Sequence, residues 1–154
     1  MKKLILPFLI VAAFLFGSCT ASKSTVSNNV NLARYEYASI INNDTYRIPP
    51  ELMEYQIQLY DAVEESKLQL VSDARIYDLT PSQQERLLLV KYGVNVQTEE
   101  TVVIVSFIDY LTGRPVASCQ GAYSSLGVAS ASHDINGAIR RVAKQISDTF
   151  NPQK

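Results

Sequence analysis

The chain has 154 residues, of which 47% are hydrophobic and 19% charged, with a formal net charge of −1 and two cysteines. This length favours a single domain, and the balanced charge argues against a dedicated nucleic-acid-binding protein, which usually has a clear basic excess. The hydrophobic fraction argues against a disordered chain, and two cysteines are too few for a miniprotein held together by disulfides.

Residues 1–18 have the pattern of an export signal. Lys2 and Lys3 precede an uncharged apolar stretch from Leu4 to Phe16. This stretch is shorter than the roughly 20 apolar residues that a membrane-spanning helix needs. Its length and its basic flank are typical of a secretory signal peptide.

The next residues, Phe16-Gly17-Ser18-Cys19, resemble the lipobox of bacterial lipoproteins, in which small residues precede a cysteine that becomes acylated. The resemblance implies cleavage before Cys19 and lipidation of its side chain, so that the lipid bilayer is a partner of the protein. The protein is then expected in a bacterial cell envelope, anchored to the inner or outer membrane, with its domain facing the periplasm or the cell surface. Cleavage after Ala21, which would release a secreted protein, is the alternative.

Cleavage before Cys19 would leave 136 residues (154 − 18) with a formal charge of −3, because Lys2 and Lys3 are removed. Cys119 would then be the only thiol without lipid, and no disulfide could form within the chain. An exposed thiol is a liability in an oxidising compartment. We therefore expect Cys119 to be buried in a strand, as free cysteines often are.

A flexible tether is predicted over residues 19–31, ahead of a single domain over 32–154. Eight of the twelve residues from Thr20 to Asn31 are Ser, Thr or Asn, with neither alternation nor helical periodicity. A coil of this length spans about 20 Å on average. The domain should therefore lie close to the membrane surface.

The domain is expected to contain both strands and helices. In chain order, the expected elements are a strand over 34–41, a helix over about 50–63, a short strand over 68–71, strands over 86–97, 101–110 and 114–123, and a helix over 132–150. Residues 73–85 fit no single element, because Thr80-Pro81-Ser82 interrupts any long one. This order predicts an α+β two-layer sandwich, in which two main helices pack on a mostly antiparallel sheet of four to five strands.

The strand over 101–110 is apolar on both faces, and two helices on one side would leave one of these faces uncovered. Large bare apolar patches are uncommon on soluble monomers. Either residues 73–85 or a helix covers that face, or it contacts a partner, by homodimerisation or by docking to an envelope protein. We name Val103, Val105 and Phe107 as candidate interaction residues.

The last helix also has a small basic patch, formed by Arg140, Arg141 and Lys144. It could contact anionic lipid or the carboxylates of peptidoglycan. The alternative is the solvated polar face of an amphipathic helix.

Candidate catalytic groups are few. His133 is the single histidine, and the consecutive run Ser132-His133-Asp134 does not have the arrangement of a catalytic triad, whose members converge from separate elements. A zinc site would need more His or Cys ligands. No catalytic residue, cofactor or metal is therefore predicted. The alternative is an envelope-acting hydrolase whose site combines distant carboxylates, such as Asp109 with Asp134 or Glu36.

Three segments of the carboxy-terminal half have a further resemblance: residues 88–93 (LLVKYG), 107–116 (FIDYLTGRPV) and 134–139 (DINGAI). They look like a family of bacterial envelope lipoproteins that contain a domain of unknown function, similar in style to the activators of penicillin-binding proteins. The resemblance implies an α/β fold and a role in envelope assembly, and it brings no catalytic residue. Together with the absence of a catalytic set, it favours a non-catalytic binding or assembly module.

Overall fold

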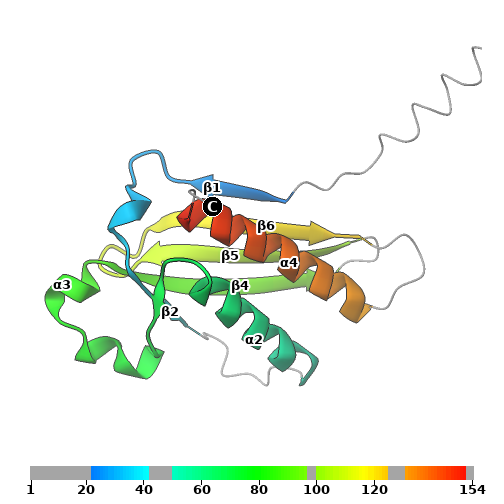
Figure 1. Ribbon diagram of the computed structural model, residues 1–154, viewed down its shortest axis with the longest axis horizontal. Helices are drawn as coiled ribbons and strands as arrows, with labels where there is room; N and C mark the ends of the chain where they lie inside the picture. The colour runs from blue at the N-terminus through cyan, green and yellow to red at the C-terminus, as the bar shows by residue number, and fades with distance from the viewer. Residues whose placement is uncertain (1–21, 42–49, 97–99, 125–130, 152–154) are drawn as a thin grey trace, which may run out of the picture.

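The computed structural model describes residues 22–41, 50–96, 100–124 and 131–151, with the backbone alone for 50–54 and 131–133 (Figure 1). Six strands form one sheet: β1 (Lys23–Val26), β2 (Tyr37–Ile40), β3 (Gln69–Leu70), β4 (Leu87–Val96), β5 (Thr101–Asp109) and β6 (Pro115–Tyr123). The two long helices are α2 (Pro50–Glu64) and α4 (Ala131–Phe150). The connections contain the short helix α3 (Pro81–Gln84) and two 3₁₀ turns, η1 (Leu32–Arg34) and η2 (Asp73–Asp78).

The strand order is β1-β6-β5-β4-β2-β3. Strands β4, β5 and β6 form an antiparallel meander, β1 is antiparallel to β6, and β2 is parallel to both β4 and β3. The parallel pairing of β2 with β3 follows from the intervening helix α2, which carries the chain back before the next strand begins. The predicted α+β class is confirmed. The sheet itself is mixed and has six strands, whereas four to five mostly antiparallel strands were expected.

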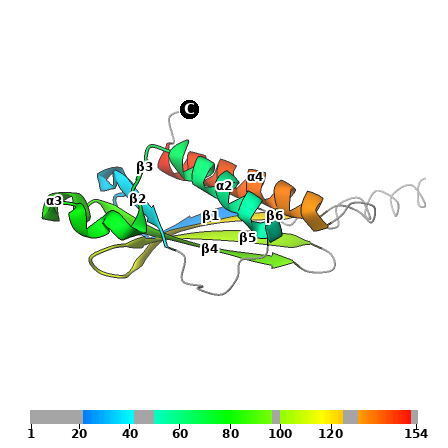
Figure 2. The same cartoon turned by 90° about the horizontal axis from the view of Figure 1, so that it is seen from below.

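Helices α2 and α4 lie side by side on one face of the sheet, which gives two layers (Figure 2). The helical spacing of the apolar residues in α4 explains this packing, because they form one stripe that faces the strands. The buried members of this stripe are Ile135, Ala138, Ile139, Val142, Ile146 and Phe150. The rings of Phe150 and Phe107 of β5 lie 4.5 Å apart between centroids and join the two layers.

Two glycines allow α4 to lie directly on β6. A Cβ atom added at Gly121 would lie 2.1 Å from the carbonyl oxygen of Ala138, and one added at Gly137 would lie 2.4 Å from the ring of Tyr123. Any side chain at these positions would therefore push the helix away from the strand. Close packing buries Cys119 of β6 completely, as the sequence analysis expected.

Residues 23–26, which the sequence analysis placed in the tether, form the edge strand β1. They pair with β6 in the register Lys23↔Gln120 to Val26↔Ala117. Their four side chains are all exposed, so no hydrophobic alternation marks them in the sequence. Backbone pairing to a neighbouring strand makes this segment part of the sheet, and the domain therefore includes residues well ahead of residue 32.

Candidate functional site

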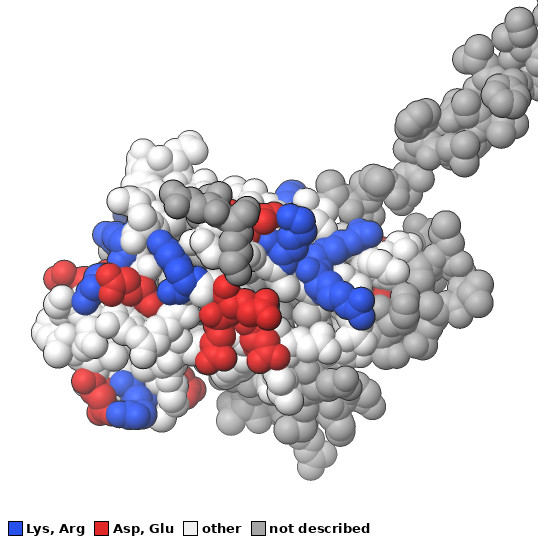
Figure 3. Space-filling model, in the orientation of Figure 1, with Lys and Arg blue, Asp and Glu red and all other residues white. Residues whose placement is uncertain are grey.

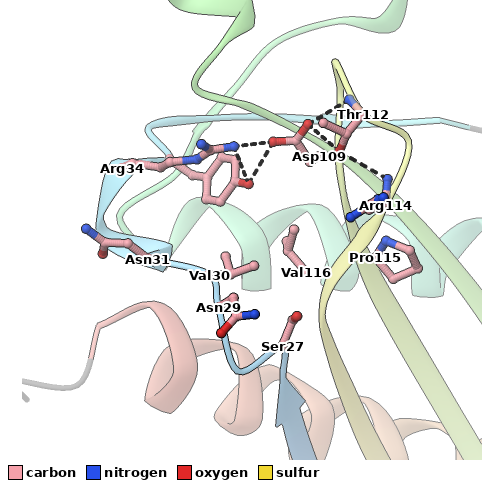
Figure 4. A pocket seen from close by; sticks show the side chains of 11 residues that line it. Ser27, Asn29, Val30, Asn31, Arg34, Asp109, Thr112, Arg114, Pro115 and Val116 are labelled. Carbon is pink, nitrogen blue, oxygen red and sulfur yellow. Dashed lines mark hydrogen bonds and ion pairs between the residues drawn. The ribbon is translucent and has the colours of Figure 1, made fainter.

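A hydrogen-bonded cluster centred on Asp109 closes one end of the sheet (Figure 4). Asp109 ends β5 and is only 3% exposed. Its Oδ2 atom accepts a hydrogen bond of 2.8 Å from the Tyr35 hydroxyl, and it also forms an ion pair with the Arg34 guanidinium. Its Oδ1 atom accepts from the backbone N–H and from the hydroxyl of Thr112, at 2.8 Å each. Both carboxylate oxygens are thus engaged.

The turn between β5 and β6 supplies one half of this cluster. Gly113 has φ +66°, a conformation that glycine adopts without steric cost, and its N–H donates to the Asp109 carbonyl at 2.9 Å. The chain returns so that the Asp109 N–H donates to the Arg114 carbonyl, also at 2.9 Å. An aspartate that begins a tight turn and accepts from the backbone farther along is a common turn signal.

The segment before β2 supplies the other half. Asn31 caps the turn η1, because its side-chain oxygen accepts from the Ala33 N–H at 3.0 Å. This turn places Arg34 and Tyr35 next to each other, with the guanidinium 4.6 Å from the centre of the tyrosine ring. Sequence reasoning missed both residues as members of a site, because nothing local connects them with a turn about 75 positions later.

The charges of the cluster are set by mutual hydrogen bonding. Burial would raise the pKa of Asp109, but the hydrogen bonds from Thr112, Tyr35 and Arg34 outweigh burial and lower this pKa below its usual value. Burial, followed by the hydrogen bond to Asp109, raises the pKa of Tyr35. The pKa of Arg34 is raised as well, first by its hydrogen bond with Tyr35. At neutral pH the three groups are therefore an anion, a neutral phenol and a cation.

A hollow of about 420 Å³ lies beside the cluster. Figure 4 shows its lining, which comes from the segment after β1, from η1 and from the β5–β6 turn. Arg34 and Arg114 contribute two cations, and Asn29 and Asn31 contribute amides. Such a lining suits a polar or anionic group. Asp109, whose oxygens are all engaged and whose pKa is low, serves to join the two chain segments and is not placed as an acid or base.

The structure corrects the prediction that three residues of β5 contact a partner. Val103, Val105 and Phe107 are fully buried against the helices and belong to the core. The opposite face of β5 bears Ile104, which is 40% exposed, and the half-buried Ser106 and Ile108. Alternation shows which residues share a face of a strand, but β5 is apolar on both faces, so its sequence does not show which face meets the helices.

Residues 73–85 lie beyond the end of the sheet, where Gln83 donates to the hydroxyl of Tyr37 at 3.3 Å. Figure 2 shows both long helices on the other side of the sheet and, among the described elements, none packed across the open side of β4, β5 and β6. Next to Ile104, a Cβ atom added at Gly93 would meet no atom within 4 Å. We call the set Leu89, Lys91, Ile104, Ser106, Ile108, Ser118 and Gln120 the open sheet face.

The basic residues of α4 have different surroundings. Arg141 donates to the Ala122 carbonyl of β6 at 2.5 Å and lies 4.9 Å over the ring of Tyr123. Lys144 pairs with Asp148 one turn later, at 2.6 Å. Arg140 is exposed and has no partner among the described residues. Arg140 also lines a hollow of about 280 Å³, together with Tyr123, Asn136, Gly137 and Arg141.

The carboxylates named for the hydrolase alternative are not brought together. Asp109 ends β5, whereas Asp134 lies near the start of α4, beside the Thr101 end of the same strand, where Gly137 approaches Tyr123. Eight residue steps along a strand correspond to about 27 Å. Glu36 pairs with Arg86 at the surface, at 2.6 Å. The side chains of Ser132 and His133 lie outside the described residues, as does Cys19.

No group of three or more His, Cys, Asp or Glu side chains is arranged to hold a metal ion within the part of the chain that the structure describes. None of the described helices combines the length and the hydropathy of a membrane span.

Comparison with known proteins gives structural neighbours alone. No protein-family model matches this chain, and no curated protein matches it either. The PelC dodecamer from Paraburkholderia phytofirmans is similar with a TM-score of 0.55 and 15% identity, over 82% of this chain and 96% of that one. A PelC variant from the same organism, also a dodecamer, gives a TM-score of 0.55 and 14% identity, over 82% of this chain and 98% of that one.

A PDZ domain protein from Parabacteroides distasonis is similar as well, with a TM-score of 0.52 and 11% identity, over 86% of this chain and 35% of that one. At these identities the comparisons show a shared fold.

Proposed function

We propose that the protein is a bacterial envelope lipoprotein that acts as a non-catalytic binding and assembly module, held to a membrane through an acylated Cys19. The signal pattern of residues 1–18 and the lipobox-like Phe16–Cys19 support the anchor. The observation that carries the binding role is the open sheet face, on which Ile104 is exposed and Leu89 and Ile108 are half-buried, while the two long helices both lie on the other side of the sheet.

The open sheet face has the composition of a contact surface. Leu89 of β4 pairs with Ile108 of β5, and Ile104 lies on the same side two pairs farther along. The pair of Lys91 and Ser106 lies between Ile104 and the pair of Leu89 and Ile108, and Gln120 lies beside Ile104. Aliphatic and polar side chains thus alternate along this face, and protein interfaces contain both kinds.

The proposed partner is a second copy of this chain. The solved chains of similar fold include one whose structure is a dodecamer, so this fold is compatible with self-association through a repeated contact. The alternative partner is a different envelope protein, which would use the same surface. Measuring the mass of the chain in solution and crosslinking from position 104 distinguish these two partners.

The binding role is tested by measuring the mass of the mature chain in solution over a range of concentrations, by light scattering after size-exclusion chromatography. Ile104→Lys should abolish self-association, because it replaces the exposed aliphatic side chain of the open sheet face with a charge. Ile57→Lys is the matched control, since Ile57 is 65% exposed on α2. If the unaltered chain is monomeric, and if a photo-crosslinker at position 104 captures no protein in native membranes, the binding role is wrong.

The anchor is tested separately in cells. Mass spectrometry of the amino-terminal peptide should find Cys19 acylated, and Cys19→Ala should release the protein from the membrane fraction. Retention of the Cys19→Ala variant in membranes would contradict the lipoprotein assignment.

A further inference from the structure

The start of the described chain and the basic residues of α4 meet at one edge of the domain. The N–H of Ala122 in β6 donates to the Ser22 hydroxyl at 3.5 Å, and the carbonyl of the same residue accepts from Arg141 at 2.5 Å. Lys23, the first residue of β1, pairs with Gln120. Arg140 and Lys144 lie on the same helix as Arg141 and are exposed. Arg141 thus lies where the chain enters the sheet, Lys23 follows at the first position of β1, and Arg140 and Lys144 are further cations on the same helix.

This edge is also the part of the domain closest along the chain to the proposed lipid. Cys19 precedes Ser22 by three residues, so at most about 11 Å separate their Cα atoms. The composition of residues 20–31 by itself predicts twelve flexible residues between the lipid and the domain. Because β1 uses residues 23–26 for the sheet, an acyl chain on Cys19 would hold this edge at the membrane surface.

The charge of the domain is unevenly distributed (Figure 3). Basic side chains gather over α4, and acidic side chains gather in the region of α2, whose carboxy-terminal turn contains Asp61 and Glu64. Asp148 neutralises Lys144 in part, whereas Arg140 has no ion-pair partner among the described residues. The mature chain has an excess of acidic residues, yet the edge next to the anchor is basic.

We propose that this basic edge lies on the bilayer, with Lys23, Arg140 and Lys144 in contact with anionic phospholipid headgroups. The proposal rests on the lipid anchor proposed above and adds the orientation of the domain to it. Cations near a membrane surface are attracted by anionic lipid over about one Debye length. In the hollow lined by Asn136, Arg140 and Arg141, the Asn136 side chain accepts from Gln58 and Arg141 donates to Ala122. The Arg140 guanidinium would therefore contact the phosphate of one headgroup there.

The orientation has a consequence for the assembly surface. The open sheet face lies on the side of the sheet opposite to α4 (Figure 2). When α4 and the start of β1 lie against lipid, the open sheet face is left free to meet a second copy. Membrane contact and self-association therefore use different surfaces of the domain.

The test is co-sedimentation of the chain from residue 20 onward, which contains every residue that the structure describes, with vesicles of phosphatidylcholine alone or mixed with phosphatidylglycerol. Binding should require phosphatidylglycerol and should weaken as salt is added. The double variant Arg140→Gln/Lys144→Gln should bind about 25-fold more weakly, because each cation near an anionic surface contributes about fivefold. Arg141 is left unchanged, since its contacts with β6 support the fold.

The matched control is Lys67→Gln/Arg75→Gln. Arg75 pairs with Asp78 as Lys144 pairs with Asp148, and Lys67, like Arg140, is exposed. The control removes the same charge from the other end of the domain and should bind almost as well as the unaltered chain. Thermal unfolding of both double variants checks that each is folded.

Equal binding to both vesicle types would overturn the proposal, as would an equal loss of vesicle binding in the two double variants. Co-sedimentation with peptidoglycan sacculi but not with vesicles would overturn it as well. Failure of the anchor is a separate result, because it is measured on the amino-terminal peptide from cells. If the vesicles bind the chain as expected but the amino-terminal peptide from cells is not acylated, the basic edge remains a membrane contact and the lipoprotein assignment is wrong.

Discussion

The carboxylate of Asp109 accepts a hydrogen bond of 2.8 Å from the hydroxyl of Tyr35, although 74 positions separate the two residues in the chain. This bond joins the segment before β2 to the turn between β5 and β6. The bond therefore holds η1 and the chain that follows it against this end of the sheet. Buried hydrogen bonds to a charged group contribute more to stability than neutral ones.

Asp109→Ala is expected to lower the free energy of unfolding by about 2–3 kcal/mol, because it leaves the buried Tyr35 hydroxyl without its acceptor and the turn without its anchor. Tyr35→Phe should cost less, about 1 kcal/mol, since it removes one of several bonds to the carboxylate. Urea unfolding followed by circular dichroism measures both. An equal stability of Asp109→Ala and the unaltered chain would show that the cluster contributes nothing.

The same carboxylate predicts a loss of stability in acid. Its pKa is lower in the folded chain than the value of about 3.9 for an unfolded aspartate. The stabilisation is therefore fully present above pH 4 and is lost as the pH falls through the folded-state pKa. Asp109→Asn should reduce the slope of stability against pH in this range, which urea titrations at a series of pH values would measure. An unchanged slope would mean that other carboxylates account for the acid sensitivity.

Because α4 packs closely on β6, adding one methyl group at Gly121 should lower the stability of the fold. Gly121→Ala would place a Cβ atom 2.1 Å from the Ala138 carbonyl oxygen, so the helix must move, and we expect a loss of about 1–3 kcal/mol. Gly93→Ala is the control within the same sheet, because it meets nothing within 4 Å. Alanine in a strand loses less chain entropy than glycine on folding, so this control should be neutral or slightly stabilising. Equal effects of the two substitutions in thermal unfolding would contradict the tight contact.

Cys119 is expected to react with thiol reagents at the rate of unfolding. Burial raises the pKa of its thiol, and its sulfur lies 3.7 Å from the Thr149 hydroxyl under α4. In the folded chain both access and thiolate formation are therefore suppressed. Labelling with iodoacetamide, with Cys19 replaced by serine, should be slow in buffer and fast in urea. Fast labelling in buffer would show that the α4–β6 contact opens readily.

Much of the architecture could be predicted because it follows from local patterns. The helical stripe of α4, the alternation of β4 and the turn at Gly113 each belong to one short segment, and the structure has all three. The core residues of β5 could not be assigned to a face, since both faces are apolar. The strand β1 was missed because its pairing with β6 involves backbone groups, which leave no pattern in exposed Ser and Thr side chains.

The sequence by itself determined the export signal pattern, the candidate lipidation site at Cys19 and the α+β class, because each depends on the composition, the period or the order of continuous segments. Only the tertiary structure decided the parallel pairing of β2, the joining of Asp109 to Tyr35, and the contact of Arg141 with Ala122 of β6. Contacts between distant segments depend on which packing buries the most apolar surface while satisfying the buried polar groups. These contacts therefore depend on the whole chain and cannot be predicted from any one segment.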